Sequence, residues 1–296
     1  MNPISLKGYL VLDKIKDGSV GTVWLARDGR GHEFALKQLG PQHASDSSQV
    51  RQFEKEARLT QKLDHPGIIK VHDYVAHKPQ PFFVMEYFVS ENLKVVLARF
   101  PERLHKREFQ VLMKVADALA HVHSRGLIHK DVKPENVLVS ASGDVRLIDF
   151  SLASTRWDRL LHFGRKVQGT PLYMAPEQIR GERGDARTDV YAFGVMMYEL
   201  LAKRPPFLAD NPAKILEKHL REKPASLRSI APAISAQLDA FVLRLLAKDP
   251  AARPADMTAV LHEITRWIKK DTVTRLQQVV SKPLQYPKAQ EVPSTV

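Results

Sequence analysis

The feature that most constrains this 296-residue chain is a short polar loop, residues 129–136, which reads His-Lys-Asp-Val-Lys-Pro-Glu-Asn. Apolar residues recur at helical spacing from Arg107 to Ser124, so a helix is predicted just before the loop. Two β-type runs, residues 137–139 and 145–148, follow it around a Ser-Gly-Asp turn, and the second ends at Asp149. A single polar residue at such a place is usually a solvated turn. Asp131, Lys133 and Asn136 together, with Asp149 beyond them, favour a catalytic loop that binds a nucleotide and its metal.

Two motifs in this region resemble those of a known enzyme family. The loop is similar to the H-R-D-x-K-x-x-N pattern of the eukaryotic-type (Hanks-type) protein kinases, and Asp149-Phe150-Ser151 is similar to their D-F-G. Further motifs follow in the family's order between about Leu10 and Trp267, and the set most resembles the bacterial Ser/Thr protein kinase catalytic domains. The resemblance implies an α+β, two-lobed protein-kinase-like fold. A small N-lobe would carry an antiparallel sheet and one main helix, and a larger C-lobe would be mostly helical.

The length of the chain suits one domain of this kind. We expect the N-lobe in residues 1–86, the C-lobe in residues 87–268 and a tail or linker in residues 269–296. The kinase domain itself would span about residues 9–268.

Local patterns predict several elements within these lobes. Residues 9–37 alternate in short runs typical of antiparallel strands, and residues 82–87 form another strand-like run. Residues 49–63 are predicted to be helical, and the polar residues 40–48 before them to form a flexible loop. The apolar run 190–202 is too short to span a bilayer, so we expect a buried core helix there.

The resemblance assigns chemical roles to the polar loop. Phosphoryl transfer asks a protein mainly for positioning and charge neutralisation. Asp131 would accept the hydrogen bond and the proton of the substrate hydroxyl, and Lys133 would offset charge on the transferring γ-phosphate of ATP. Asn136 and Asp149 would supply the hard oxygen ligands that Mg²⁺ prefers. The lysine two residues after the aspartate is the Ser/Thr-kinase arrangement, so we expect transfer to Ser/Thr hydroxyls of proteins, with autophosphorylation.

A second group of residues would bind ATP. Gly18 and Gly21 resemble the glycine-rich turn whose N–H groups approach the phosphates without an intervening Cβ. Lys37, in Phe-Ala-Leu-Lys, resembles the lysine that contacts the α- and β-phosphates, and Glu56 resembles its helix partner. Met85 would lie behind the adenine, and backbone groups of Glu86 and Phe88 would hydrogen-bond its edge. The resemblance also places at this site Ile15, Val23, Ala35 and Leu138.

Four further residues are expected to support the site structurally. Thr170 would contact Asp131 and Lys133 and form part of the floor of the peptide site. Arg253 would pair with Glu177 of the Ala-Pro-Glu stretch, and Asp189 would brace the backbone of the catalytic loop.

Three residues depart from the family's pattern. Lys16 stands in place of the first glycine of the turn, Lys130 in place of the arginine before the catalytic aspartate, and Ser151 in place of the glycine of D-F-G. A lysine lacks the bidentate fork with which that arginine grips a phosphate. In the family that phosphate is on the activation loop, which would lie here between Asp149 and Glu177. We therefore expect phosphorylation of this loop to control activity less strongly than in typical members. Loss of all activity on replacing Ser154 and Thr155 together with alanine would contradict this.

The formal net charge of +12 raises the question of nucleic-acid binding. Lysine and arginine are scattered rather than clustered in a block, so nucleic-acid binding is not favoured as the main role. A basic stretch follows Thr155 and indicates either a solvated face or a preference for acidic or phosphorylated substrates. It contains Arg156, Arg159, Arg165 and Lys166.

Composition sets the remaining expectations. The chain has no cysteine and begins without the basic and apolar segments of a secretory signal, so we expect a cytoplasmic protein with no membrane segment. Its oligomeric state cannot be predicted. Two other functions are considered: a nucleotide-binding pseudokinase scaffold and a small-molecule phosphotransferase. The complete set of motif residues argues against the first, and the peptide-binding segment around Thr170 argues against the second.

Overall fold

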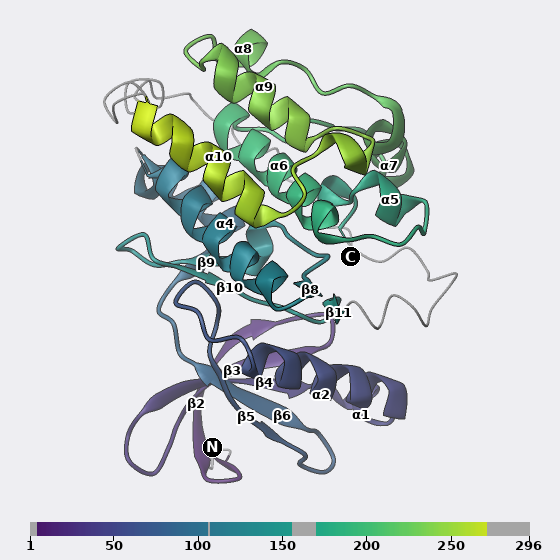
Figure 1. The fold of residues 1–296 in the computed structure, drawn as a ribbon. Helices are drawn as coiled ribbons and strands as arrows, with labels where there is room; N and C mark the ends of the chain where they lie inside the picture. The colour runs from purple at the N-terminus through teal and green to yellow at the C-terminus, as the bar shows by residue number, and fades with distance from the viewer. Residues whose placement is uncertain (1–4, 106, 156–169, 271–296) are drawn as a thin grey trace.

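The computed structural model describes residues 5–105, 107–155 and 170–270, and Figure 1 shows them as two lobes. The N-lobe, in the lower half of that view, is built around a sheet. The C-lobe above it is mostly helical. This arrangement agrees with the predicted α+β class.

The N-lobe sheet has six antiparallel strands in the order β1-β2-β3-β4-β6-β5. β4 lies at its centre and pairs Ala35 with Met85 and Lys37 with Phe83 of β6. These pairings set the lysine strand directly beside the strand that leads to the interlobe connection. The strands are β1 (Ser5–Leu6), β2 (Tyr9–Asp17), β3 (Gly21–Arg27), β4 (Glu33–Leu39), β5 (Val71–Val75) and β6 (Phe82–Glu86).

The main N-lobe helix, α2 (Ser47–Gln61), packs on this sheet. Phe53 of the helix is buried, and its ring lies 5.0 Å from that of Phe83. Glu56 lies one turn after Phe53, on the same buried side of the helix, and therefore faces the lysine strand.

The prediction of a flexible loop at residues 40–48 is wrong. The segment contains a helical turn, α1 (Pro41–Ala44), and α2 begins at Ser47. Pro41 occupies the first helical turn, where its missing N–H costs nothing. The Asp46 side chain accepts the Ser48 N–H as an N-cap. These polar residues are helix-initiating signals as well as loop formers, which explains the error.

The core of the C-lobe is α6, which packs against α4, α8, α9 and α10. Nearly all of its side chains from Val190 to Ala202 are buried, as the apolar run predicted. The helices are α3 (Leu93–Arg99), α4 (Glu108–Ser124), α5 (Pro176–Ile179), α6 (Ala186–Ala202), α7 (Pro212–Arg221), α8 (Leu227–Ile230), α9 (Ala236–Leu245) and α10 (Met257–Lys270). Short 3₁₀ turns accompany them: η1 (Pro101–Leu104), η2 (Pro134–Asn136), η3 (Pro171–Tyr173) and η4 (Pro250–Ala252).

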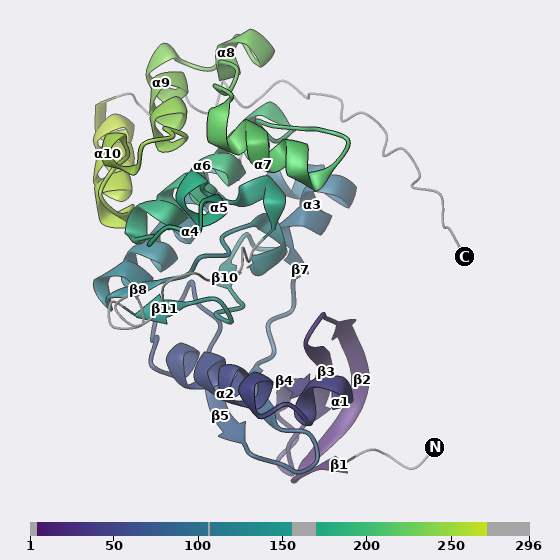
Figure 2. The same cartoon turned by 90° about the vertical axis from the view of Figure 1, so that its right-hand side faces the viewer.

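Short strands lie where the lobes meet, as Figure 2 shows. β9 (Val137–Val139) pairs with β10 (Val145–Leu147) and with β7 (Glu91–Asn92), and β8 (Leu127–Ile128) pairs with β11 (Ser154–Thr155). Leu147 of β10 also exchanges backbone hydrogen bonds with Gly67 and Ile69, in the loop between α2 and β5. The catalytic loop therefore begins and ends on strands at the lobe junction. Within the described part of the chain, no helix has the length and apolar character needed to cross a bilayer.

Candidate active site

The polar loop at residues 129–136, here called the catalytic loop, is anchored by Asp189, which is fully buried on α6. Its carboxylate accepts the backbone N–H groups of His129 and Lys130, each at 2.8 Å, and lies 2.9 Å from Nε2 of His123. The Lys130 carbonyl accepts a hydrogen bond from the Gln178 side chain at 3.0 Å. Lys130 has a φ of 68°, a left-handed conformation that costs a non-glycine residue energy. Contacts on both sides of the residue hold this conformation, and the bracing role expected for Asp189 agrees with this geometry.

These contacts predict an acid-sensitive contribution to stability. Burial alone would raise the pKa of Asp189, but the hydrogen bonds from His123 and His129 lower it below its ordinary value. The contribution is therefore present above the unfolded-state pKa of about 3.9 and is lost as the pH falls through the lower folded pKa. We expect Asp189→Asn to be less stable than the parent at pH 7, with the difference shrinking below about pH 4. Urea unfolding of both proteins at pH 7 and in acid measures this, and a difference independent of pH would contradict it.

Asp131 lies at the centre of a compact polar group. Its Oδ2 is 2.7 Å from Nζ of Lys133 and accepts a hydrogen bond from Nδ2 of Asn136 at 3.0 Å. Nζ of Lys133 also donates to Oγ1 of Thr170 at 2.7 Å. The structure thus brings together the predicted catalytic pair and one of the predicted metal ligands. It records the expected Thr170 contact with Lys133, which ties the loop to the peptide side of the site.

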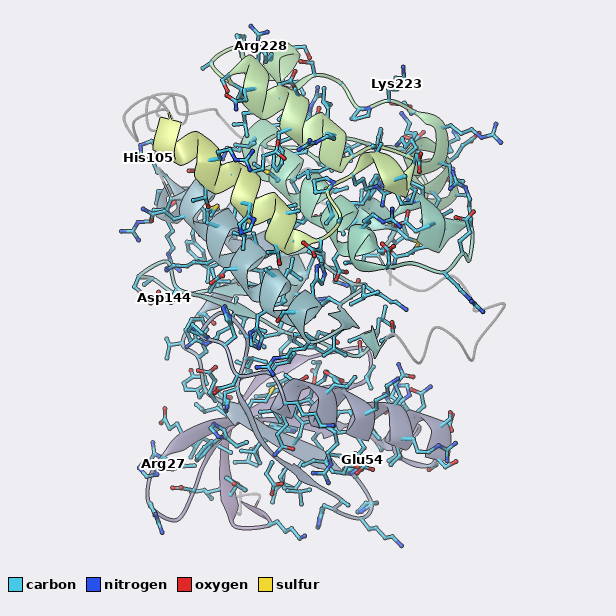
Figure 3. The ribbon with its side chains drawn as sticks, viewed as in Figure 1. Arg27, Glu54, His105, Asp144, Lys223 and Arg228 are labelled. Atoms are coloured by element: carbon cyan, nitrogen blue, oxygen red, sulfur yellow. The ribbon has the colours of Figure 1, made fainter. Side chains whose placement is uncertain are left out.

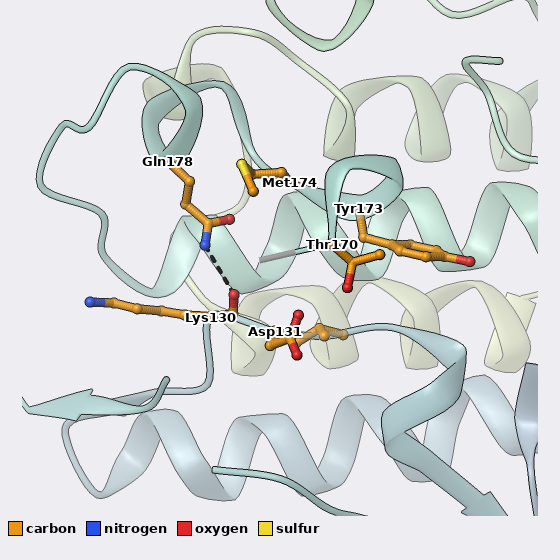
Figure 4. A pocket seen from close by; sticks show the side chains of 7 residues that line it. Lys130, Asp131, Thr170, Tyr173, Met174 and Gln178 are labelled. Carbon is orange, nitrogen blue, oxygen red and sulfur yellow. Dashed lines mark hydrogen bonds between the residues drawn. The ribbon is translucent and has the colours of Figure 1, made fainter. Parts of the chain in front are cut away.

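A small pocket opens beside Asp131 on this side. Figure 4 shows the Thr170 side chain facing Asp131, whereas the Lys130 side chain extends away from it. The walls of the pocket come from the catalytic loop and from the segment that leads into α5. The lining residues are Lys130, Asp131, Val132, Thr170, Tyr173, Met174 and Gln178.

Lys37 and Glu56 form the predicted pair across the N-lobe. Nζ of Lys37 donates to Oε1 of Glu56 at 2.6 Å, and both side chains are largely buried. Burial alone would lower the pKa of Lys37, but the charges of Glu56 and Asp149 overcome this and raise it. The lysine is therefore a fixed cation that faces the D-F-G aspartate as well as its helix partner.

Replacing Lys37 with methionine tests the importance of this cation. The change removes a positive charge next to the expected phosphates and leaves Glu56 buried without its partner. We expect phosphoryl transfer to fall by about 10²- to 10³-fold, the range for loss of one preorganised electrostatic contact. Initial rates with labelled ATP measure this. Lys62→Met, at an exposed lysine just after α2, is the matched control and should keep the parent rate. A Lys37→Met rate within tenfold of the parent would contradict the prediction.

Hydrogen bonds orient Asn136 and Asp149, the two expected metal ligands. Because Nδ2 of Asn136 donates to Asp131, the amide oxygen is the atom left for a metal. Asp149 has a φ of 65°, and its Oδ1 accepts the Ser151 N–H at 3.3 Å. Burial would raise the pKa of Asp149, but Lys37 and the Ser151 N–H lower it, so the carboxylate is ionised. In the described ranges no group of three or more His, Cys, Asp or Glu residues could hold a metal. Mg²⁺ commonly uses one or two protein ligands together with phosphates and water, and this pair fits that pattern.

Phe150 explains why the D-F-G segment keeps this position. Its ring is buried and lies 4.7 Å from the ring of His129 in the catalytic loop. The four non-glycine residues with positive φ in the described segments are Lys7, Lys130, Asp149 and Lys203, so Ser151 needs no glycine-like conformation here. The serine at this position is thus compatible with the observed backbone.

The turn between β2 and β3 has the geometry of a tight backbone loop. A Cβ on Gly21 would lie 1.9 Å from the carbonyl oxygen of Gln38 on the neighbouring strand, so only glycine fits there. The Gly18 N–H donates to the Gly21 carbonyl at 2.8 Å, and Thr22 donates to Asp17 at 2.9 Å. The turn is further tied to α1, because Nε2 of His43 lies 3.0 Å from the Ser19 carbonyl.

The apolar residues expected around adenine lie on five strands. Ile15 and Val23 lie on β2 and β3, Ala35 on β4, and Met85 at the end of β6. Leu138 is half-buried on β9, across the lobe junction. Ala35 pairs directly with Met85 across β4 and β6, and the roles of all five residues stay predictions.

Arg146 is a residue at this junction for which the sequence predicts no role. Its guanidinium forms a pair with Glu86, at 2.9 Å and 3.3 Å, and lies 4.4 Å from the ring of Phe88. It also donates to the carbonyl of Pro66 in the loop after α2. Arg146 therefore links the interlobe connection to both lobes. No motif marks it, since a polar residue on a short alternating strand usually faces solvent.

Some sequence predictions lie outside these observations. The basic residues Arg156, Arg159, Arg165 and Lys166, and the tail after residue 270, lie outside the described residues. Ser154 is buried on β11, so its phosphorylation would require that strand to open. The weaker phosphorylation switch stays a prediction.

Comparisons with known proteins identify the family of the chain. The family described as "Protein kinase domain" matches residues 9–265. The chain is 37% identical over 257 residues to the serine/threonine-protein kinase PknB of Mycobacterium tuberculosis, covering 83% of this chain and 41% of that protein. It is 32% identical over 248 residues to the serine/threonine-protein kinase PrkC of Bacillus subtilis, covering 83% of this chain and 38% of that protein. The chain thus spans about two fifths of the length of these relatives.

A solved structure gives the same result for the fold. The crystal structure of a mutant form of the kinase domain of Mycobacterium tuberculosis PknI aligns with a TM-score of 0.69 at 29% identity. The alignment covers 90% of this chain and 98% of that one. The predicted two-lobed fold and the resemblance to bacterial Hanks-type Ser/Thr kinases are therefore confirmed, and the chain belongs to the protein kinase domain family.

Proposed function

We propose that the chain transfers the γ-phosphate of ATP to serine and threonine hydroxyls of protein substrates, and to hydroxyls of its own chain. The observation that carries this proposal is the group around Asp131. Its carboxylate lies 2.7 Å from Lys133, which in turn contacts Thr170 on the peptide side. A base, a cation and a peptide-facing hydroxyl in one group suit the delivery of an acceptor hydroxyl to a phosphate.

Asp131 would act on the acceptor. Its Oδ2 already accepts from Lys133 and Asn136, which hold the carboxylate in one orientation. A substrate hydroxyl would donate to the remaining lone pairs and give up its proton as the new P–O bond forms. Lys133 would keep its charge near the transferring group, because its Nζ is held between Asp131 and Thr170.

The nucleotide would lie on the other side of this group. Lys37, oriented by Glu56, would contact the phosphates, and the Gly18–Gly21 turn would cover them. The Glu86 carbonyl and the Phe88 N–H would hold the adenine edge, with Ile15, Val23, Ala35, Met85 and Leu138 as apolar walls. Asn136 and Asp149 would hold Mg²⁺. When bound, that ion neutralises charge on the β- and γ-phosphates.

The function is tested by incubating the chain with γ-labelled ATP, Mg²⁺ and a generic protein acceptor, followed by phosphoamino acid analysis. The proposal predicts label on serine and threonine of the acceptor and of the chain, and a loss of label in Asp149→Asn. Nucleotide binding without transfer would instead indicate a scaffold. Transfer only to small hydroxyl compounds would indicate a small-molecule phosphotransferase.

A cytoplasmic site of action is also proposed, on the basis of the sequence. Cell fractionation followed by detection of the kinase domain tests this, and the domain is expected in the cytoplasmic fraction. Its recovery outside the cytoplasm would contradict the proposal.

A further inference from the structure

A buried histidine lies beneath the turn that follows Thr170. His219 is on α7 and is 0% exposed. Figure 2 shows α7 beside α5 and α6, and α7 also packs against η3, the turn formed by Pro171–Tyr173. This histidine belongs neither to the family motifs nor to the polar group around Asp131. A buried imidazole with defined partners nevertheless fixes whatever it contacts.

The partners of the ring determine its tautomer. Nε2 lies 3.1 Å from the carbonyl oxygen of Leu172, which can only accept, so Nε2 carries the hydrogen. Nδ1 lies 2.8 Å from the Tyr191 hydroxyl and must accept from it. Burial and the charge of Lys248 lower the pKa of His219 to about 4, in agreement with a neutral ring. The hydrogen bonds therefore run in one direction, from Tyr191 through His219 to Leu172.

The ring is also held by its neighbours. It packs edge-on against Phe207, with centroids 4.9 Å apart, and against Tyr191 at 5.7 Å. The Arg253 guanidinium lies 4.7 Å from the Tyr191 ring and pairs with Glu177. His219 therefore cannot rotate without disturbing its neighbours, and the Leu172 carbonyl is held with it.

Leu172 lies between two residues that line the pocket beside Asp131. Thr170 is held by Lys133 at 2.7 Å, and the Tyr173 hydroxyl donates to Glu199 at 2.5 Å. The contact from His219 is a further attachment of this turn, through its backbone. Under the proposed function, a protein acceptor would lie along this turn to reach Asp131, because residues of the turn line the pocket beside that carboxylate. ATP would lie on the side of Lys37.

We infer that His219 is a positioning residue for the protein acceptor, acting through the Leu172 carbonyl. The inference rests on the proposed function, because it concerns the second substrate of that reaction. Loss of the contact frees the turn, and displacement of an acceptor by about 1 Å can cost about 10²-fold in rate. Binding of ATP and its slow hydrolysis by water do not need the turn and stay unchanged.

The test compares transfer to protein with hydrolysis of ATP by water. His219→Phe keeps an aromatic ring against Phe207 but removes both hydrogen bonds and leaves the Leu172 carbonyl unpaired. The expected result is a drop of about tenfold or more in kcat/KM for the protein acceptor. The KM for ATP and the rate of ATP hydrolysis without acceptor stay within about twofold. His219→Gln, whose amide can donate to Leu172 and accept from Tyr191, should recover part of the loss.

Two further variants complete the design. His105→Phe, at an exposed histidine of the C-lobe labelled in Figure 3, is the control and should match the parent. If His219→Phe fails to fold, Tyr191→Phe replaces it, because it removes only the hydroxyl that orients the imidazole. Tyr191→Phe should also lower kcat/KM for the protein acceptor selectively, but by a smaller factor.

Equal losses in protein transfer and in ATP hydrolysis would overturn the inference, as would parental kinetics for the acceptor. A parent protein that hydrolyses ATP but phosphorylates no protein would overturn the proposed function as well, so the two failures are distinguishable.

Discussion

Replacing Asp131 with asparagine is expected to lower kcat for protein phosphorylation by about 10²- to 10⁴-fold, the range for loss of a positioned general base. The amide cannot accept the acceptor proton, although it has nearly the same shape. The affinity for ATP should stay within about twofold, because Lys37, Glu56 and Asp149 remain in place. Rates with labelled ATP and equilibrium nucleotide binding measure the two quantities.

Asp144→Asn is the matched control for this variant. Asp144 lies in the exposed turn between β9 and β10, on the surface of the C-lobe in Figure 3, and its carboxylate pairs with Lys114. It should transfer phosphate at the parent rate. If Asp131→Asn lost ATP affinity in proportion to its rate, the carboxylate would be serving nucleotide binding, and the proposed role would be wrong.

Replacing Arg253 with alanine is expected to give the largest loss of stability, about 3–5 kcal/mol, as for other buried pairs that lose one partner. The guanidinium makes five hydrogen bonds: two to Glu177 and one each to the carbonyls of Arg187, Ala247 and Lys248. Both side chains of the ion pair are almost completely buried, so the variant leaves the Glu177 side chain buried without its main partner. Urea unfolding at pH 7 measures the change.

Two variants sharpen this prediction. Arg253→Lys should recover little, since an ammonium cannot reproduce the planar fork. Arg187→Ala removes a neighbouring, partly exposed arginine paired with Asp185, and should cost no more than about 1 kcal/mol. An Arg253→Ala loss equal to that of Arg187→Ala would show that the buried pair does not stabilise the C-lobe.

The parts of the site that could be predicted from sequence are those in which residue type and spacing carry the chemistry. Lys37 and Glu56 are nineteen residues apart, yet their expected pairing is present at 2.6 Å. The pair between Glu177 and Arg253 is another case. The helix predicted from Arg107 to Ser124 agrees with α4 to within one residue. The prediction succeeds because the apolar stripe of this helix faces the core.

What could not be predicted depends on contacts between positions that carry no local signal. His219 acts on Leu172, forty-seven residues earlier, through a single ring nitrogen. Arg146 reaches Glu86 and the loop after α2 from a three-residue strand. The sequence of α1 predicts a loop because proline and small polar residues serve both turns and helix starts. Only the folded arrangement distinguishes these cases.

The most direct test of the site is a crystal structure of the chain with Mg²⁺ and a non-hydrolysable ATP analogue. We expect a Mg²⁺ ion about 2.0–2.1 Å from one oxygen of Asp149 and from the amide oxygen of Asn136. Lys37 would lie within hydrogen-bonding distance of the α- or β-phosphate while still paired with Glu56. A metal bound without Asn136 and Asp149, or a nucleotide seated away from Lys37, would contradict the account.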